Sequence, residues 1–366
     1  MKAEAIMVTP KDNVVTVVHG AKAGEEVHYF KGAELCSVIT TEDIPPCHKI
    51  AVAPIAKGEH IIKYGEIIGG AQVDIPVGSW VSHLNIESLP RDYKRPDGSV
   101  GIRNHVLILP GCACASETCR VVASQVSGAV NIINNSGCAE VKGNEDMTQK
   151  ILVGFAANPN VYGVVVIGLG CENVSHSQLR ESILKVTNKP VVSFGIQEEG
   201  GTLKTIEKAV RVARQMVADA SQVTREPCDI SNLMLGIECG GSDATSGFGA
   251  NPAVGNLSDR LVDLGASTMM SETIEFVGAE HILARRGATK EIHDQIIQIC
   301  RDYEAHLAAA GQDCRHGQPT PGNKEGGLST IEEKSLGCIH KGGTRPIVEV
   351  VMEGERPTKK GAIVMD

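Results

Sequence analysis

The feature that most constrains the fold is an alternation of apolar runs and amphipathic segments that begins at residue 105. Continuous apolar strands that alternate with helices are typical of a parallel sheet covered on both faces. We therefore expect an α/β domain over residues 105–228. Its strands are predicted at 105–111, 129–134, 161–170 and 190–195, and its helices at 116–125, 144–157, 175–187 and 199–221.

A second, Rossmann-like α/β unit is expected over residues 229–366. A strand from residue 233 leads into a glycine-rich loop, and a long Gly/Pro loop at 319–338 runs into a short helix. A strand-like run begins near residue 360, so we expect the sheet of this unit to be C-terminally incomplete. The other predicted strands are 267–272 and 346–352, and the predicted helices are 274–285 and 290–308.

The N-terminal part of the chain predicts a different architecture. Residues 1–88 contain short β-branched or alternating runs, at 14–18, 26–30 and 49–53, with glycines between them. This pattern indicates a small, clip-like all-β domain. Residues 89–104 mix proline, glycine and charges, and we interpret them as a linker.

Three cysteines follow successive strands of the first predicted sheet. Cys114 comes after the first strand, Cys138 after the second and Cys171 after the third. The carboxyl ends of parallel strands share one edge, where ligands bind. Three thiolates there would suit iron, as a single ion or as a cluster. The alternative is that each cysteine is a small apolar residue packed inside the domain.

The glycine-rich loop at residues 235–255 carries a second group of candidate residues. Glycine allows the backbone to approach a ligand closely, and the loop follows an apolar strand. The alternative is a helix-entry loop whose serine or aspartate is an N-cap. The polar side chains concerned are Glu238, Ser242, Asp243 and Asn251, beside Cys239.

Further candidates lie at the ends of other predicted elements. The predicted strand at 267–272 ends in Glu272, and Glu275 lies just beyond it. The two are either an acid/base or metal pair, or carboxylates that match a helix dipole. Two histidines, His48 and His83, lie at strand ends of the all-β domain, where surface or hydrogen-bonded histidines are also common. Arg103, Asn323 and Lys324 lie in polar segments, and the two cations would suit a carboxylate substrate or be solvated charges.

Composition excludes several classes of function. The net charge is −9 and aromatic residues make up 3% of the chain, which disfavours nucleic-acid binding. No apolar run reaches the roughly 18 residues of a membrane span, and we see no secretory signal. Twelve cysteines without a signal peptide indicate a reducing, cytoplasmic setting.

Several separated motifs, in the same order, resemble the altronate and galactarate dehydratase family. The resemblance spans almost the whole chain. It implies that residues 1–88 form a β-clip (SAF-like) domain. The motifs are Gly168 to Glu172, Gly236 to Asp243, Ser271 to Glu275, Pro321 to Lys324 and Arg95 to Asn104.

The resemblance also implies a hydro-lyase that removes water from a hexonate or aldarate and uses Fe(II), with Mn(II) as an alternative. A base would take the proton next to the carboxylate, and the metal would stabilise the enolate. Under this hypothesis His48, His83, Glu238, Asp243 and Glu272 are catalytic. Arg103, Ser242, Asn251, Asn323 and Lys324 would bind a small sugar acid, and Cys114, Cys138 and Cys171 would bind metal.

Two other functions are compatible with the same residues. One is a sulfolactate sulfo-lyase, which expels sulfite from a similar enolate, and the other is a non-catalytic module that binds sugar acids. Three positions depart from the family pattern, since Ser82 and Asn134 stand where histidines are common and Ile274 stands where proline is common. We also expect a homodimer, without a nucleic-acid or membrane partner.

Overall fold

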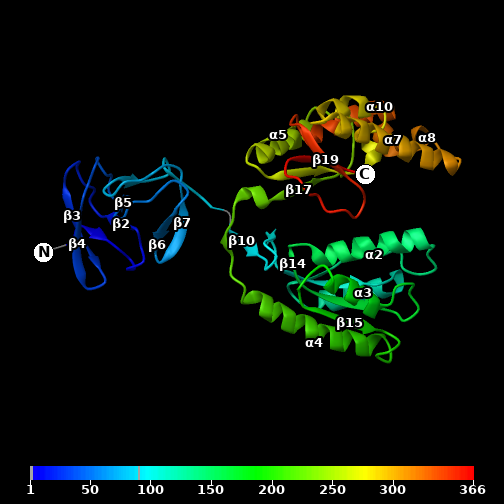
Figure 1. The fold of residues 1–366 in the computed structure, drawn as a ribbon, viewed down its shortest axis with the longest axis horizontal. Coiled ribbons are helices and arrows are strands. Elements are labelled where there is room, and N and C mark those ends of the chain that lie inside the picture. Colours follow the sequence, from blue (N-terminus) through cyan, green and yellow to red (C-terminus); the bar gives the residue numbers. More distant parts are fainter. Residues whose placement is uncertain (1–2, 90) are drawn as a thin grey trace. The chain divides into compact units, whose positions relative to one another are not determined.

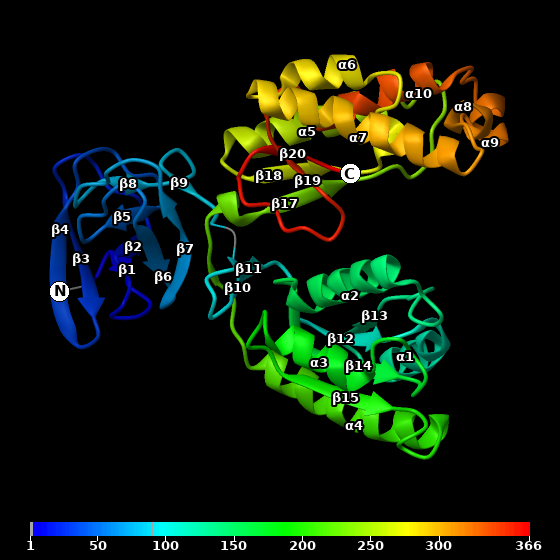
Figure 2. The same ribbon diagram turned by 45° about the vertical axis from the view of Figure 1, so that its right-hand side comes forward.

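The computed structural model describes residues 3–89 and 91–366 and divides them into two compact units. The first unit runs from Met1 to Pro90 and the second from Arg91 to Asp366. Figures 1 and 2 show strands alone in the blue first unit, and helices with sheets in the second. We describe each unit by itself.

Unit 1 is built from strands, as the sequence predicts, and its strand pairings are antiparallel. Its sheets have the orders β1-β2-β5-β8 and β6-β7-β9, with β3-β4 as a separate hairpin. Asp12, which is 5% exposed, accepts the backbone N–H groups of Tyr64 and Gly65 and so holds the β6–β7 turn. The strands are β1 (Ala5–Ile6), β2 (Val14–Val17), β3 (Glu26–Lys31), β4 (Glu34–Ile39), β5 (Lys49–Ala51), β6 (His60–Lys63), β7 (Glu66–Ala71), β8 (Trp80–Val81) and β9 (Ile86–Glu87).

The segment interpreted as a linker contains two strands of a small antiparallel sheet. β10 (Arg91–Lys94) pairs with β11 (Val100–Gly101) and with β16 (Glu226–Pro227). The Asp97 carboxylate accepts hydrogen bonds from the backbone N–H and the hydroxyl of Ser99, which closes the turn between β10 and β11. Proline and glycine therefore mark a hairpin turn here rather than an extended connection.

The first α/β domain has the parallel sheet that the alternating pattern predicts. The strand order is β13-β12-β14-β15, and every pairing is parallel. Helices α1 and α4 pack in a core on one face of the sheet, while α2 and α3 pack in a second core on the other. The elements are β12 (His105–Pro110), η1 (Ala113–Ala115), α1 (Ser116–Ser124), β13 (Ala129–Asn131), α2 (Lys142–Ala157), β14 (Val161–Gly168), α3 (His176–Leu184), β15 (Val191–Gly195) and α4 (Thr202–Ser221).

The second α/β domain contains another parallel sheet, in the order β17-β18-β20-β19. Its main core joins this sheet to α6 and α7. The elements are η2 (Ile230–Asn232), β17 (Met234–Ile237), α5 (Ala250–Asp263), β18 (Ser267–Met270), η3 (Thr273–Glu275), α6 (Glu280–Leu283), η4 (Ala284–Arg286), α7 (Lys290–Ala309), α8 (Cys314–Gly317), α9 (Pro321–Glu325), α10 (Ile331–Cys338), η5 (Ile339–Gly342), β19 (Ile347–Val351) and β20 (Ala362–Met365).

Three predicted elements are wrong in detail. The helix predicted at 274–285 is divided into η3, α6 and η4, because Gly278 adopts a φ of +87° that ends helical geometry. The loop predicted at 319–338 contains α9, which begins with a capping box between Thr320 and Asn323. The strand predicted at 129–134 ends at Asn131.

The expected fold class is confirmed, with antiparallel strands followed by two parallel-sheet α/β domains. Within residues 3–89 and 91–366, no helix has the length and apolar character needed to cross a membrane.

Helix α5 depends on a glycine for its close packing against η5. A Cβ at Gly255 would lie 2.1 Å from the carbonyl oxygen of His340, whereas a Cβ at Gly154 in α2 would meet no atom within 4 Å. We expect Gly255→Ala to lower the free energy of unfolding by about 1–3 kcal/mol. Gly154→Ala should raise it by about 0.5–1 kcal/mol, because alanine loses less backbone entropy in a helix. Denaturant unfolding measures both, and a Gly255→Ala protein as stable as the wild type would contradict this packing.

Candidate functional site

The glycine-rich loop after β17 presents its polar side chains in two different ways. Asp243 is exposed, and its Oδ1 atom accepts hydrogen bonds from the backbone and hydroxyl groups of Thr245 and Ser246. The hydroxyl of Thr245, followed by the bonds from Ser246, lowers the pKa of Asp243. One oxygen of this predicted catalytic residue therefore holds its own loop together. Asp243 is not the N-cap that the helix-entry alternative expects, because the N-cap of α5 is Gly249 and no side chain caps it.

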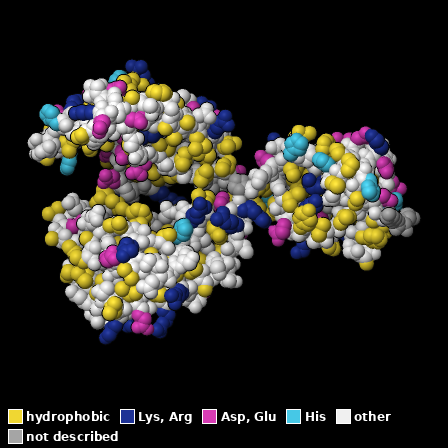
Figure 3. Space-filling view, turned by 180° about the vertical axis from the view of Figure 1, so that it is seen from behind, with side chains coloured by type: hydrophobic (Ala, Val, Ile, Leu, Met, Phe, Trp, Pro, Cys, Tyr) yellow, Lys and Arg dark blue, Asp and Glu magenta, His cyan; other side chains and the backbone are white. Residues whose placement is uncertain are grey.

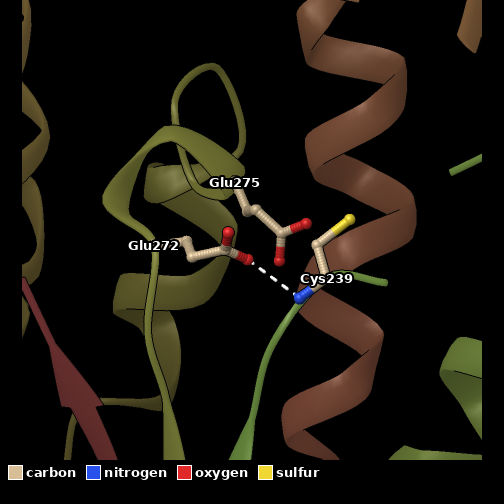
Figure 4. Close-up of side chains that lie close together, drawn as sticks. All are labelled: Cys239, Glu272 and Glu275. Atoms are coloured by element: carbon tan, nitrogen blue, oxygen red, sulfur yellow. Dashed lines mark hydrogen bonds between the residues drawn. The ribbon is translucent and has the colours of Figure 1, made fainter. Parts of the chain in front are cut away.

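Cys239, Glu272 and Glu275 bring a thiol and two carboxylates together (Figure 4). One candidate ligand atom from each residue lies within 4.8 Å of the others, and the part of the chain that the structure describes contains no other such group of three. Glu272 follows β18, and its Oε2 atom accepts the backbone N–H of Cys239 at 2.9 Å. The Cys239 sulfur also lies 3.4 Å from the Ser242 hydroxyl.

Behind Glu272, Glu275 lies in a buried ion pair. Glu275 is 3% exposed and Lys341 6%. The Lys341 ammonium donates to Oε2 of Glu275, and the Cys338 thiol donates to Oε1 at 3.2 Å. Burial alone would lower the pKa of Lys341, but the hydrogen bond and charge of Glu275 raise it. Burial, followed by the Glu275 charge, raises the pKa of Cys338 to about 12.

Lys341 and Cys338 are absent from the predicted site, although they contact it. The sequence holds one indication that Cys338 and Lys341 act together. They are three residues apart and so share one side of a helical segment. A lysine is rarely buried unless it is paired, however, and its partner Glu275 lies 66 residues away in the chain.

The predicted substrate-binding residues of this domain lie around the same loop. Asn323 donates through its amide to the Ser242 carbonyl at 2.8 Å. Asn251, buried near the start of α5, donates to the Gly337 carbonyl at 3.0 Å. Glu238 and Lys324 are exposed. Hydrogen bonds to backbone carbonyls thus fix the side chains of Asn251 and Asn323, the second of them to Ser242. The side chains of Glu238 and Lys324 lie at the surface.

The predicted metal-binding cysteines follow three adjacent parallel strands of the first α/β domain. Cys114, Cys138 and Cys171 are all exposed. Burial, followed by the neighbouring thiols of Cys112, Cys114 and Cys171, raises the pKa of Cys138 to about 12. The three sulfurs do not all lie within 4.8 Å of one another, unlike the ligand atoms of the Cys239 group.

The predicted histidines belong to unit 1. The pairing of Lys49 with Val81 places His48 and His83 at the same end of strands β5 and β8. His48 accepts a hydrogen bond at Nδ1 from the Trp80 indole at 2.9 Å, and its ring packs edge-on against that indole. His83 is exposed. One histidine therefore has a defined packing role within unit 1, and the catalytic role of both stays a prediction.

Arg103 is exposed at the end of the small sheet that begins unit 2. Its backbone N–H donates to the Asn160 side chain, and its guanidinium donates to the Ile102 carbonyl. The neighbouring Arg95 is more constrained, because its guanidinium donates to the Pro159 carbonyl and to the Asn104 side chain. Arg103 is thus the more available cation of the two.

A cavity of about 1170 Å³ opens onto one face of β17 and β18 within unit 2. Figure 3 shows the second unit hollowed, with hydrophobic side chains beside the hollow. Glu272 is the predicted site residue that lines the cavity. The wall residues of β17 and β18 alternate along the strands, namely Met234, Gly236, Ser267 and Met269, and Ser271 follows β18.

Comparison with known proteins identifies the family. An altronate/galactarate dehydratase SAF domain model matches residues 3–89. The second-domain model of D-galactarate dehydratase/altronate hydrolase matches residues 92–221, and the D-galactarate/altronate dehydratase C-terminal model matches 230–366. The chain belongs to the altronate and galactarate dehydratase family. The resemblance in the sequence motifs is therefore confirmed, including the SAF domain.

Individual relatives support the same assignment. The altronate dehydratase of Bacillus subtilis is 30% identical over 98% of this chain and 78% of its own length. The galactarate dehydratase (L-threo-forming) of Escherichia coli is 34% identical over 98% of this chain and 76% of its own length. The (2R)-sulfolactate sulfo-lyase subunit beta of Chromohalobacter salexigens is 40% identical, over 75% of this chain and 70% of that protein.

Because Glu275 and Lys341 form a buried ion pair, we expect replacement of Lys341 to destabilise the protein more than replacement of the exposed Lys290. Lys341→Met leaves the Glu275 charge buried and unpaired, which should cost about 3–5 kcal/mol of unfolding free energy at neutral pH. Lys290→Met breaks an exposed pair with Asp294 and should cost less than about 0.5 kcal/mol. The double variant Lys341→Met/Glu275→Gln should recover much of the loss, because no charge is left unpaired. Denaturant titration tests this, and equal costs for Lys341→Met and Lys290→Met would argue against a buried pair.

Proposed function

We propose that this chain is a sugar-acid dehydratase that acts on a hexonate or aldarate such as altronate or galactarate. The observation that carries the proposal is the match of relatives named altronate and galactarate dehydratase over 98% of the chain. The thiols and carboxylates that follow the parallel strands of both α/β domains support it, since this is where such folds hold reacting groups.

The reaction is an elimination followed by tautomerisation. The C–H bond next to the substrate carboxylate breaks, and its proton goes to a base on the protein. The electron pair forms the C–C double bond of an enol, while the C–O bond at the next carbon breaks and hydroxide leaves as water after receiving a proton. The enol then becomes a 2-keto-3-deoxy acid.

Different side chains would transfer the proton and bind the substrate carboxylate. Glu238 and Glu272 are the carboxylates best placed for proton transfer, because both lie at the carboxyl ends of β17 and β18 and Asp243 is used by its own loop. Arg103 and Lys324 are exposed cations suited to the substrate carboxylate. The predicted roles of His48 and His83 remain part of the proposal.

Iron would be held by Cys114, Cys138 and Cys171. Their donor set fits a sulfur-rich iron site, since three exposed thiols follow adjacent strands of one parallel sheet. The iron would be a single ion or an iron–sulfur cluster. Such iron supplies Lewis-acid stabilisation of negative charge on substrate oxygens. The homodimer expected from the sequence also stays a proposal.

A sulfo-lyase is the second candidate, because the sulfo-lyase subunit beta is the 40% identical relative. It would begin with the same loss of a proton and then break a C–S bond to release sulfite. A binding module without catalysis is the third candidate.

Anaerobically purified protein supplied with Fe(II) should convert altronate or galactarate to a keto acid that reacts with semicarbazide. The product should form at the same rate that the sugar acid is consumed, and added chelator should stop the reaction. Sulfolactate is the matched comparison substrate. Sulfite release from sulfolactate without keto acid formation from any sugar acid would replace the dehydratase with the sulfo-lyase, and inactivity on both classes would favour the binding module.

Cysteine variants test the proposed iron ligands by iron content, without a measurement of enzyme activity. Cys138→Ser should lower the iron content of the anaerobic protein by at least about half, because one thiolate ligand is lost. Cys47→Ser is the matched control, since Cys47 is an exposed cysteine of unit 1. Iron analysis and the visible absorption of the protein measure the effect. Unchanged iron in Cys138→Ser would remove the strand-end thiols from the proposed site.

A further inference from the structure

We propose that Lys49, Lys63 and Tyr64 of unit 1 form a binding site for a small organic acid, whose carboxylate lies between the two lysine ammonium groups. Lys49 is the first residue of β5, Lys63 is the last residue of β6, and Tyr64 follows it. The reaction proposed above uses none of these side chains. Unit 1 would therefore bind an acid at a place of its own, apart from the strand ends of unit 2.

The strands of unit 1 place both lysines at the margin of one core. Lys49 comes two residues before the buried Ala51 on β5, and Lys63 comes two residues after the buried Ile61 on β6. Each lysine therefore lies on the same side of its strand as that core residue. Ala51 and Ile61 belong to one buried cluster, and both lysines are half-buried. Their aliphatic stems can thus cover the edge of this core while the ammonium groups meet solvent.

Neither lysine forms an ion pair with any residue of 3–89. Asp12, the buried carboxylate of the β6–β7 turn, instead accepts the backbone N–H groups of Tyr64 and Gly65. The Lys63 ammonium lies 4.7 Å from the centre of the Tyr64 ring, and this cation–π contact supplies no full negative charge. The described residues thus leave both positive charges without a paired carboxylate.

The two ammonium groups also act on each other. Burial, followed by the charge of Lys63, lowers the pKa of Lys49, and Tyr64 offsets part of this effect. Two like charges that interact in a half-buried place destabilise each other. An anion between them would remove this repulsion and favour the charged form of both lysines. Partial burial would strengthen that attraction, because water screens the charges less.

Two hydroxyl groups beside the lysines indicate what kind of anion fits. Thr16 lies directly opposite Lys49 in the pairing of β2 with β5, and its buried hydroxyl oxygen has no hydrogen-bond partner among the described residues. Tyr64 is 60% exposed, so its phenol is accessible to a ligand. A hydroxyl group both donates and accepts hydrogen bonds. An acid that carries hydroxyls beside its carboxylate would use both capacities, whereas phosphate would chiefly use donors. The site therefore suits a polyhydroxylated carboxylic acid.

The test measures how fast each lysine of the full chain reacts with a low dose of acetic anhydride, by peptide mass spectrometry. Only an uncharged amine is acetylated, so an anion that favours the ammonium form slows the reaction. We expect an excess of galactarate to slow the acetylation of Lys49 and Lys63 at least about threefold. The exposed Lys57, which lies before β6 begins, is the internal control and should react at an unchanged rate.

Two other solutes identify what the site recognises, at the same ionic strength. Galactitol has the carbon skeleton and hydroxyls of galactarate without its carboxylates, and it should not protect the lysines. Inorganic phosphate supplies the charge without the hydroxyls, and it should protect them less than galactarate does. The choice of galactarate as the probe rests on the function proposed above, whereas the site itself rests on the arrangement of unit 1.

A variant connects the protection to the pair of lysines. Lys49→Gln should remove most of the galactarate protection at Lys63, because the carboxylate loses one of its two cations, whereas Lys57→Gln should leave that protection intact. The comparison of solutes uses the unchanged chain, so it decides the proposal even if Lys49→Gln does not fold.

Three results would overturn the site. They are equal acetylation rates with and without galactarate, equal protection by galactitol, and protection by phosphate that equals or exceeds protection by galactarate. The measurement reports binding in unit 1 and needs no turnover. A failed dehydratase assay would therefore leave it unaffected, and unprotected lysines would leave the proposed reaction standing.

Discussion

The ion pair between Glu275 and Lys341 is the interaction on which the second α/β domain depends most. Glu275 lies in η3, just after β18, and Lys341 lies in η5, just after α10. The Lys341 carbonyl accepts the Ser258 hydroxyl of α5 at 2.9 Å, so the pair also connects the helix that follows the glycine-rich loop. A buried charge that lost its partner would be costly, and the three segments are therefore held in one arrangement. The positions of Cys239 and Glu272 follow from that arrangement.

Much of the fold could be predicted because it depends on local patterns. The apolar runs of β12 and β14 are continuous and buried, and both sheets are parallel as expected. From that single inference it followed that Cys114, Cys138 and Cys171 lie along the carboxyl edge of one sheet. The failures occur where a single residue overrides the pattern. Gly278, with its positive φ, divides a segment whose apolar spacing predicts one continuous helix.

The candidate site could be predicted only in part, because long-range pairing decides what each polar side chain does. Residue type alone marks Asp243 and Arg95 as groups that could bind a ligand. In the structure Asp243 holds the turn around Thr245 and Ser246, while Arg95 reaches carbonyl and amide oxygens of its own domain. Conversely, Lys341 looks like an ordinary exposed lysine in the sequence. Its role depends on Glu275, a contact that no local spacing reveals.

The backbone of Glu272 argues that its carboxylate has a purpose beyond folding. Glu272 adopts φ 69° and ψ 77°, a left-handed conformation that glycine would adopt without strain. A side chain held there costs on the order of 1–3 kcal/mol, and such residues concentrate at functional sites. The bond from the Cys239 N–H to Glu272 offsets part of this cost, but a neutral acceptor would also satisfy one part-buried backbone amide. What only a carboxylate provides at this position is a negative charge beside a thiol and a second carboxylate, at a residue that lines the cavity. The strain is therefore best explained by chemistry that needs this charge, whether it accepts a proton or binds a metal ion.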